Sequence, residues 1–336
     1  MTVEPLPEDF GHAVARFLER PVGELFEWPV CALCGSDGRD TVVIEEFART
    51  PLQIVRCTEC GFCYSWPRPT AWFAGIIHDP HSRNSMVDAG ILPEARRMWG
   101  DAIFDYDKQT QMDQTYRQGL REIARRAPRG TLLDVGCAGG RFVELALEAG
   151  YEAIGVDVQS APLTRGREEL GLDLRLCAPN ELPADLPPIT VVTLWNVLEH
   201  VSEPVELLTA IRRVVTDGGV LLLDVPNFAF RLVQWRLRGI SRPACQRFMP
   251  QDHINHFTAS TLRRMLGTAG FSVAHFSLAH ADGATGARAS FRRGAMRTIH
   301  AVSAGRVNWH HPLSCLACKQ QGSGPQRATE CMRELT

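Results

Sequence analysis

Apolar and polar positions follow two alternating periods through the middle of the chain. From residue 131 to about residue 276, short apolar runs alternate with segments in which apolar residues recur every three or four positions. The short runs are typical of buried strands, and the longer period is typical of helices that cover a sheet. The predicted strands are 132–135, 153–158, 172–176, 190–194, 220–225 and 271–276. This order predicts an α/β fold with a doubly wound, mostly parallel sheet.

The helical segments between these strands carry end signals. Gly150, Gly171 and Gly270 each follow a periodic segment directly, as expected of residues that end a helix. Ser202 and Thr258 precede periodic segments and are candidate N-caps. The predicted helices are 107–127, 142–149, 163–170, 203–216, 230–237 and 259–269.

A glycine-rich turn joins the first predicted strand to the helix that follows it. Gly136, Ala138 and Gly140 lie in this turn, where small residues let the backbone approach a ligand. The free N–H groups at the start of the helix favour polar or anionic groups. A dinucleotide fingerprint needs glycine where Ala138 and Arg141 stand, so the pattern argues against NAD. We expect a nucleotide-sized ligand of another kind.

The second predicted strand ends in Asp157, 23 residues after Asp134. An acid at this position in nucleotide-binding α/β folds accepts hydrogen bonds from ribose hydroxyls. Taken alone, an acid such as Asp157 is more often a solvated turn residue. The glycine turn at the neighbouring strand favours the ribose role.

Two Cys-x-x-Cys-Gly motifs lie near the N-terminus, separated by a segment with strand character. Four thiolates at this spacing suit tetrahedral zinc, and the glycine after each pair permits the tight turn around the metal. We expect a structural zinc ion, with Cys63 as a bystander because four ligands already satisfy the metal. The predicted ligands are Cys31, Cys34, Cys57 and Cys60.

Composition is that of an ordinary globular protein. The chain has 336 residues, of which 45% are hydrophobic and 22% are charged. A net charge of −2 argues against a general affinity for nucleic acid. We find neither a long apolar run nor a signal-like N-terminus, so we expect a cytoplasmic protein without a membrane partner. In such a protein the spacing of the 11 cysteines indicates metal binding instead of disulfides.

The motifs divide the chain into five parts. We expect an N-terminal extension (1–30), a zinc ribbon (31–66), a linker that forms a lid (67–106), a cofactor-binding domain (107–280) and a basic, poorly ordered tail (281–336). From residue 283 onward there are eight basic and two acidic residues. An alternative for the tail is a second metal site. Its ligands would come from Cys315, Cys318, Cys331, His310 and His311.

The glycine turn resembles the Asp-x-Gly-x-Gly-x-Gly loop of class I S-adenosylmethionine-dependent methyltransferases. Asp134, Gly136 and Gly140 match that loop, and Ala138 stands in place of the middle glycine. Residues 31–276 as a whole resemble the methyltransferase domain 23 group, which has an N-terminal zinc ribbon and includes bacterial sugar C-methyltransferases and natural-product methyltransferases. Further matching motifs are Asp157 and the runs 196–200, 226–227 and 252–257.

This resemblance implies a Rossmann-like fold and S-adenosyl-L-methionine as cofactor, beside the zinc ion. The family often places an acid after the third strand to contact the adenine. Here Asn180 or a backbone group would take that part, because 177–180 holds no carboxylate. The cofactor-binding residues that the resemblance implies are Asp134, Gly136, Cys137, Ala138, Gly140, Asp157, Val158, Trp195 and Asn196.

The expected function is methylation of an oxygen or a carbon in a small-molecule or sugar-type acceptor, in bacterial secondary metabolism or polysaccharide biosynthesis. Such acceptors must lose a proton, and histidine is the usual base near neutral pH. The candidates are His253, His256 and His200, with Glu199 available to orient His200, to bind a substrate amine or to cap a helix. The oligomeric state stays open.

Two other classes of function stay open. An RNA methyltransferase could combine a zinc ribbon with this fold, although the Asn-Pro-Pro-Tyr run of base-amino methylases is missing after the fourth strand. A binding module that has lost catalysis would keep the fold but fail to hold the cofactor.

Overall fold

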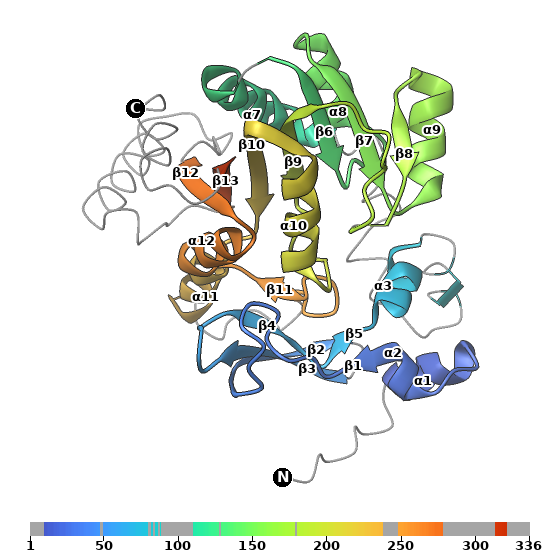
Figure 1. Cartoon of the computed structure of the whole chain (residues 1–336). Helices are drawn as coiled ribbons and strands as arrows, with labels where there is room; N and C mark the ends of the chain where they lie inside the picture. Colours follow the sequence, from blue (N-terminus) through green and yellow to red (C-terminus); the bar gives the residue numbers. More distant parts are fainter. Residues whose placement is uncertain are drawn as a thin grey trace. The chain divides into compact units, whose positions relative to one another are not determined.

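The computed structural model describes residues 10–47, 50–79, 110–127, 129–178, 180–237, 248–277 and 313–320, together with positions 82, 85, 86 and 88. The chain forms two compact units, and each unit combines segments that are distant in sequence (Figure 1). The first unit contains residues 1–103 and 233–256, and the second contains residues 104–232 and 257–336. We refer to them as the ribbon unit and the seven-stranded unit.

The sheet that gives the seven-stranded unit its name forms its centre. Its strand order is β12-β13-β10-β9-β6-β7-β8. Neighbouring strands from β10 to β8 run parallel, and β13 runs antiparallel to both of its neighbours. The strands are β6 (Thr131–Val135), β7 (Glu152–Asp157), β8 (Leu174–Leu176), β9 (Ile189–Trp195), β10 (Val215–Val225), β12 (Phe271–Ser277) and β13 (Leu313–Lys319). The predicted doubly wound, mostly parallel α/β fold is confirmed.

One helix precedes the first of these strands in the chain and the others follow strands, as the periodicity predicts. They are α7 (Asp113–Arg126), α8 (Arg141–Glu148), α9 (Ser160–Leu170), α10 (Pro204–Val214), α11 (Phe228–Leu237) and α12 (Ala259–Thr268). Thr258 caps α12 and accepts a hydrogen bond from the backbone N–H of Thr261. The expected cap Ser202 is wrong, because α10 begins after Glu203 with Pro204 in its first turn, where the fixed φ of proline suits a helix start.

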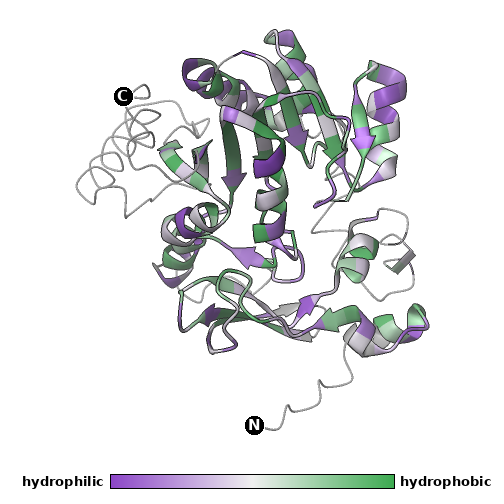
Figure 2. Ribbon diagram, viewed as in Figure 1, coloured by the Kyte–Doolittle hydropathy of each residue, from purple (hydrophilic) through white to green (hydrophobic). Residues whose placement is uncertain are grey.

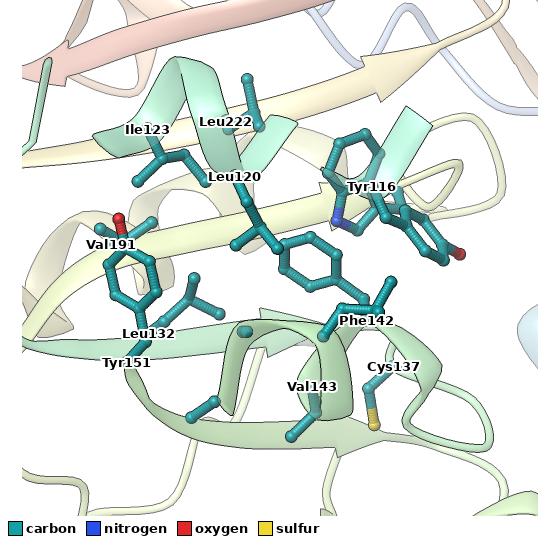
Figure 3. Packing of buried hydrophobic residues seen from close by; sticks show 14 of the residues in the cluster. Tyr116, Leu120, Ile123, Leu132, Cys137, Phe142, Val143, Tyr151, Val191 and Leu222 are labelled. Atoms are coloured by element: carbon teal, nitrogen blue, oxygen red, sulfur yellow. The ribbon is translucent and has the colours of Figure 1, made fainter. Parts of the chain in front are cut away.

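The core of this unit joins α7 and α8 to the sheet. Figure 3 shows side chains of α7, among them Tyr116 and Leu120, packed beside Phe142 of α8 and above Leu132 of β6. All four are at least nine-tenths buried. Colouring by hydropathy shows the central strands as mostly apolar, whereas the helices carry both apolar and polar residues (Figure 2). Burial of these apolar faces is the main force that holds the helices on the sheet.

Strand β13 corrects the expectation of a poorly ordered tail. Its residues pair with β10 on one side and with β12 on the other, and six of its seven positions are buried. Cys315 and Cys318 lie three positions apart on this strand, so their side chains point to opposite faces. They therefore do not share a metal ion. His310, His311 and Cys331 lie outside the described residues.

A four-stranded sheet forms the ribbon unit's centre. Its strand order is β11-β4-β3-β2, and all its pairs are antiparallel. The strands are β2 (Arg39–Phe47), β3 (Thr50–Cys57), β4 (Cys63–Trp66) and β11 (Asn255–His256). Strand β11 also changes the expected domain boundary, because residues 233–256 belong with the ribbon and not with the cofactor-binding domain.

The rest of the ribbon unit has its own hydrophobic core. Val14, Phe26, Leu52, Phe73 and Ile77 belong to one buried cluster, which unites the N-terminal extension, the ribbon and the start of the expected linker. The elements are α1 (Phe10–Phe17), α2 (Val22–Leu25), β1 (Phe26–Glu27), β5 (Arg68–Pro69) and α3 (Ala71–His78). Most of the segment that we expect to form a lid lies outside the described residues. Within the described parts of the chain, we find no helix with the length and apolar character needed to cross a bilayer.

Candidate functional site

The glycine loop between β6 and α8 has three residues in the left-handed region. The φ angles are +78° at Gly136, +45° at Ala138 and +86° at Gly140, which is the N-cap of α8. Glycine adopts such angles freely, whereas alanine does so at a cost of about 1 kcal/mol. Ala138 therefore keeps the loop geometry of the glycine that it replaces, and adds one methyl group.

Asp157 binds the glycine loop from the tip of β7. Its Oδ2 accepts a hydrogen bond of 2.9 Å from the backbone N–H of Ala138, and its Oδ1 accepts one of 2.9 Å from the backbone N–H of Gln159. The backbone N–H groups of Gly136 and Cys137 donate to the carbonyl of Val156 over 2.8 and 3.1 Å. A carboxylate has about four lone-pair directions, and these two hydrogen bonds use one on each oxygen of Asp157.

Val158 follows Asp157 and is 54% exposed, which is unusual for a residue at the end of a buried strand. Leu176, the last residue of β8, is 55% exposed, and its Cα is paired with that of Asp157 in the sheet register. Two apolar side chains thus lie open beside the acid. Such a surface suits the flat face of a heterocyclic base.

Asp134 and Cys137 support the loop from beneath. Asp134 is buried within the sheet, where its Oδ1 accepts a hydrogen bond of 2.7 Å from the hydroxyl of Thr193, and burial raises its pKa to about 8. Burial also raises the pKa of the Cys137 thiol. The structure therefore places both side chains inside the fold, and only their backbone groups can face a ligand.

Trp195 is buried, whereas the neighbouring Asn196 is exposed. The indole of Trp195 is buried, with ring centroids 5.1 Å from those of both Tyr116 and Phe142. Asn196 has a φ of +53°, and its backbone N–H donates to the carbonyl of Asp224 over 2.9 Å. Because its side chain is exposed, Asn196 is the member of this pair that can reach a ligand.

His200 lies in the turn that follows β9. Its backbone N–H donates to the carbonyl of Val197 over 2.9 Å, and its Nε2 lies 3.9 Å from Oε1 of the fully buried Glu199. The carboxylate is close enough to favour one orientation of the imidazole. His200 therefore belongs to the seven-stranded unit, near the same end of the parallel strands as Asn196.

His253 and His256 belong to the ribbon unit. His256 is buried in β11, where its Nε2 lies 3.4 Å from the hydroxyl of Ser65, and Nε2 of His253 lies 4.0 Å from Oδ2 of Asp252. The sequence does not identify Ser65 as a partner of the histidine segment, because a single serine in a short strand forms no recognisable motif. The residue that contacts it lies 191 positions further along the chain.

The four predicted zinc ligands form one cluster. Every sulfur lies within 4.8 Å of the others, with distances of 3.4 Å between Cys31 and Cys60 and 3.5 Å between Cys34 and Cys57. A tetrahedron with Zn–S bonds of about 2.3 Å has S–S edges of about 3.8 Å. The donor set and its spacing therefore fit zinc.

The surroundings of these thiols also suit a metal. Gly35 and Gly61 have φ angles of +75° and +74°, and each turns the chain after its cysteine pair. Burial opposes ionisation of Cys57, but the backbone N–H groups of Cys60 and Glu59 outweigh it and lower the pKa of Cys57 to about 7. Cys63 lies outside the cluster, and burial raises the pKa of its thiol to about 12.

Comparison with known proteins places this geometry in a family. Residues 107–275 match the family model described as a methyltransferase domain, of the domain 23 type. A ubiquinone biosynthesis O-methyltransferase of Pseudomonas paraeruginosa is 33% identical over 103 residues, which are 29% of this chain and 44% of that protein. Its counterpart from Cereibacter sphaeroides is 32% identical over 123 residues, which are 33% of this chain and 50% of that protein. The chain thus spans about half the length of these curated relatives.

Solved structures with a similar fold have low sequence identity. A magnesium protoporphyrin IX methyltransferase from Synechocystis, solved with bound SAH, has a TM-score of 0.44 and 15% identity, with 71% of this chain and 98% of that chain covered. An S-adenosylmethionine-dependent methyltransferase from Clostridium acetobutylicum has a TM-score of 0.45 and 11% identity, with 64% and 96% covered.

The family model spans about half of the chain, including the glycine loop, Asp157 and the turn that carries His200. This chain therefore belongs to the class I, S-adenosylmethionine-dependent methyltransferase family of the domain 23 type.

Proposed function

We propose that this protein transfers the methyl group of S-adenosylmethionine to a hydroxyl oxygen of a small molecule. The observation that carries the proposal is the hydrogen bond between Asp157 and the backbone N–H of Ala138. It joins the acid at the tip of β7 to the glycine loop at the tip of β6. These are the two elements that a nucleoside cofactor needs at neighbouring strand ends.

Each part of the cofactor has a partner in this arrangement. The carboxylate of Asp157 would accept hydrogen bonds from the ribose hydroxyls, and the backbone from Gly136 to Gly140 would hold the amino-acid portion. The exposed side chain of Val158 would contact the base, and the amide of Asn196 would offer polar contacts. Asp134, Cys137 and Trp195 act by holding the backbone in place, since their side chains are buried.

Zinc has a structural role in this proposal. Cys31, Cys34, Cys57 and Cys60 hold it, and it stabilises the turns on which the ribbon sheet is built. A sheet of four short strands has little core of its own, so metal binding contributes much of its folding free energy. None of these thiols takes part in methyl transfer.

The choice of oxygen as the accepting atom rests on the relatives that are O-methyltransferases by name, at 31–33% identity to this chain. The aligned part covers 44–50% of their length, so the acceptor of this chain is a proposal and not a property carried over from them. We propose a small-molecule hydroxyl as acceptor, with sugar-type compounds among the candidates. A carbon beside a carbonyl is the second choice, because it also needs a base.

The cofactor supplies a methyl group that is already activated on a sulfonium ion. The acceptor oxygen forms a bond to the methyl carbon while the carbon–sulfur bond breaks and its electron pair stays on sulfur. The hydroxyl proton must leave, and the candidate bases are His200, His253 and His256, of which His200 belongs to the same unit as the glycine loop. Holding the oxygen in line with the methyl carbon provides much of the acceleration, and the base adds about a hundred- to ten-thousandfold.

Transfer of a labelled methyl group tests this function. The full chain is incubated with S-adenosylmethionine that carries an isotopic label on the methyl group and with a panel of phenols, sugars and extracts of the source cells. The products are identified by mass spectrometry. Label in a methyl ether supports the proposal, whereas label only in RNA, or no cofactor binding in calorimetry, contradicts it.

Histidine variants then test the base. Loss of the base should lower turnover by about a hundred- to ten-thousandfold while leaving cofactor affinity nearly unchanged, and His256→Gln is one of the three variants. His253→Ala and His200→Ala are compared in the same assay. If only His200→Ala slows turnover, the base lies in the turn after β9; if none of the three does, the acceptor is a nucleophile that needs no base.

A further inference from the structure

Arg141 lies directly after the glycine loop, at the first position of α8. A positive charge is unfavourable there, because the N-terminus of a helix carries the positive end of the helix dipole. Two carboxylates offset this charge. The Nε of Arg141 donates to Oδ1 of Asp113 over 2.8 Å, and its two terminal nitrogens contact Oδ2 of Asp113 and Oε2 of Glu144. The fold thus keeps a cation beside the loop at a position where helix electrostatics disfavours it.

The ion pair between Arg141 and Asp113 joins two helices. Asp113 is the first residue of α7, so the pair ties the start of α7 to the start of α8. Two guanidinium nitrogens meet two carboxylate oxygens, a geometry that adds both strength and directionality. The side chains of Arg141 and Asp113 are only 14% and 27% exposed, which limits screening by salt. The hydrogen bonds from Arg141 lower the pKa of Asp113, so the carboxylate is charged at neutral pH.

The next turns of α7 pack on the same part of the unit. Tyr116 and Gly119 follow Asp113 at intervals of three residues, so all three lie on one side of the helix. The ring centroid of Tyr116 lies 5.3 Å from that of Phe142 in α8 (Figure 3). A Cβ atom on Gly119 would come within 2.5 Å of Cη2 of Trp195, so the indole packs directly on the helix backbone. This side of α7 therefore contacts the start of α8 and the end of β9.

We propose that Asp113 and Arg141 are a positioning pair for the cofactor loop. Asp157 holds the middle of the loop through the backbone N–H of Ala138, and the ion pair anchors the Gly140 end of the loop to α7. The inference rests on the proposed function in one respect, that the loop holds the amino-acid portion of S-adenosylmethionine. The pair should therefore set the affinity for that portion and leave the affinity for the nucleoside unchanged.

Hydrogen exchange of the full chain without ligand tests the anchoring itself. Asp113→Asn removes the negative charge, and we expect the backbone amides of residues 136–145 to exchange faster than in the wild type. The control is Glu148→Gln. Glu148 pairs with Arg117 over 3.1 Å and joins the same two helices at the other end of α8, where both side chains are half exposed. This control should leave exchange in 136–145 unchanged. Unchanged exchange in Asp113→Asn, or equal acceleration in the two variants, overturns the inference.

Calorimetry with two nucleosides tests the consequence for binding. S-adenosylhomocysteine carries the amino-acid portion, whereas 5′-methylthioadenosine lacks it. We expect Asp113→Asn to bind S-adenosylhomocysteine about fivefold more weakly, at the upper end for a partly exposed ion pair, and to bind 5′-methylthioadenosine as the wild type does. Equal losses for the two compounds, or no loss for S-adenosylhomocysteine, overturn the positioning role. If the wild type binds neither compound, the proposed function fails, while hydrogen exchange still decides whether the pair anchors the loop.

Further variants separate the ion pair from general destabilisation. Asp113→Glu keeps the carboxylate and should retain most of the affinity for S-adenosylhomocysteine. In an Arg141→Gln background the pair is already broken, so Asp113→Asn should cause no further loss of that affinity. An additional loss of similar size means that Asp113 acts without Arg141, which overturns the inference. Should Asp113→Asn fail to fold, Arg141→Lys takes its place in both measurements with the same expected results, because lysine keeps the charge but cannot make the bidentate contact.

Discussion

Gly136 of the glycine loop lies directly against the side chain of Val197, in the turn after β9. A Cβ atom built on Gly136 would come within 2.3 Å of Cγ2 of Val197, closer than real Cβ contacts. Gly136 also has a φ of +78°, an angle that L side chains rarely adopt. Two independent constraints thus require glycine here, and together they link the cofactor loop to the turn that carries His200.

Replacement of Gly136 by alanine should therefore destabilise the folded protein by more than backbone strain alone would. We expect Gly136→Ala to lower the free energy of unfolding by about 2–5 kcal/mol, from strain of about 1–2 kcal/mol plus overpacking of about 1–3 kcal/mol, and to weaken cofactor binding. Thermal unfolding and calorimetry measure both effects. Gly218→Ala is the control, because Gly218 has a φ of +79° but no atom within 4 Å of its Cβ position. Equal losses in the two variants would mean that contact with Val197 does not matter.

Loss of the Asp157 carboxylate should weaken cofactor binding. Asp157→Ala removes the acceptor for the ribose hydroxyls and for the N–H of Ala138, so we expect a loss of roughly 1.5–3 kcal/mol of binding free energy, typical of a hydrogen bond to a charged group. Asp157→Asn should lose less, because one oxygen remains. Calorimetry with S-adenosylmethionine compares the affinities of the variants. Asp185→Ala is the control. The Asp185 side chain is 82% exposed, and among the described ion pairs it contacts only Arg175. Equal affinity in Asp157→Ala would move the ribose contact elsewhere.

The four-cysteine cluster should bind about one zinc ion per chain. Cys34→Ser and Cys60→Ser each remove one thiolate from the tetrahedron, and we expect both variants to lose the metal and part of the ribbon's stability. Metal analysis by mass spectrometry gives the stoichiometry. Cys63→Ser should retain zinc, because Cys63 lies outside the cluster. A full zinc content in both ligand variants is incompatible with this assignment.

Burial of Asp134 should make stability depend on pH. Its pKa in the folded state is raised to about 8 from 3.8, so between about pH 4 and pH 8 the folded state holds a proton that the unfolded state has released. Stability contributed by this group therefore falls as pH rises through that window. Asp134→Asn keeps an acceptor for the hydroxyl of Thr193 but cannot ionise. The wild type should lose more Tm than this variant between pH 5 and pH 8, and parallel pH profiles would contradict the prediction.

The sequence was sufficient for local elements whose residues are close together in the chain. The glycine turn follows its strand directly, and Asp157 ends the next one, so pattern and spacing located both. The sequence does not show whether a side chain at the end of a strand points into the core or toward a ligand. For this reason Trp195 was expected beside the cofactor, whereas its indole is buried against Tyr116 and Phe142.

Long-range pairing was beyond sequence reasoning. Nothing in the run around His256 indicates that it pairs with β4, because strands of two residues give no periodic pattern. Strand β13 was missed for another reason. Its sequence is rich in small residues and cysteine, and only its pairing with β10 and β12 makes it a strand. Burial by tertiary contacts outweighed a weak local propensity.

The place of β13 in the sheet also determines when this unit can be completed during synthesis. Strand β12 reaches the sheet only through β13, which lies between it and β10. Until residue 319 has left the ribosome, β10 therefore exposes an apolar edge that would accept a strand from another chain. A truncated chain that ends before residue 313 should keep this edge open permanently, with aggregation as the consequence.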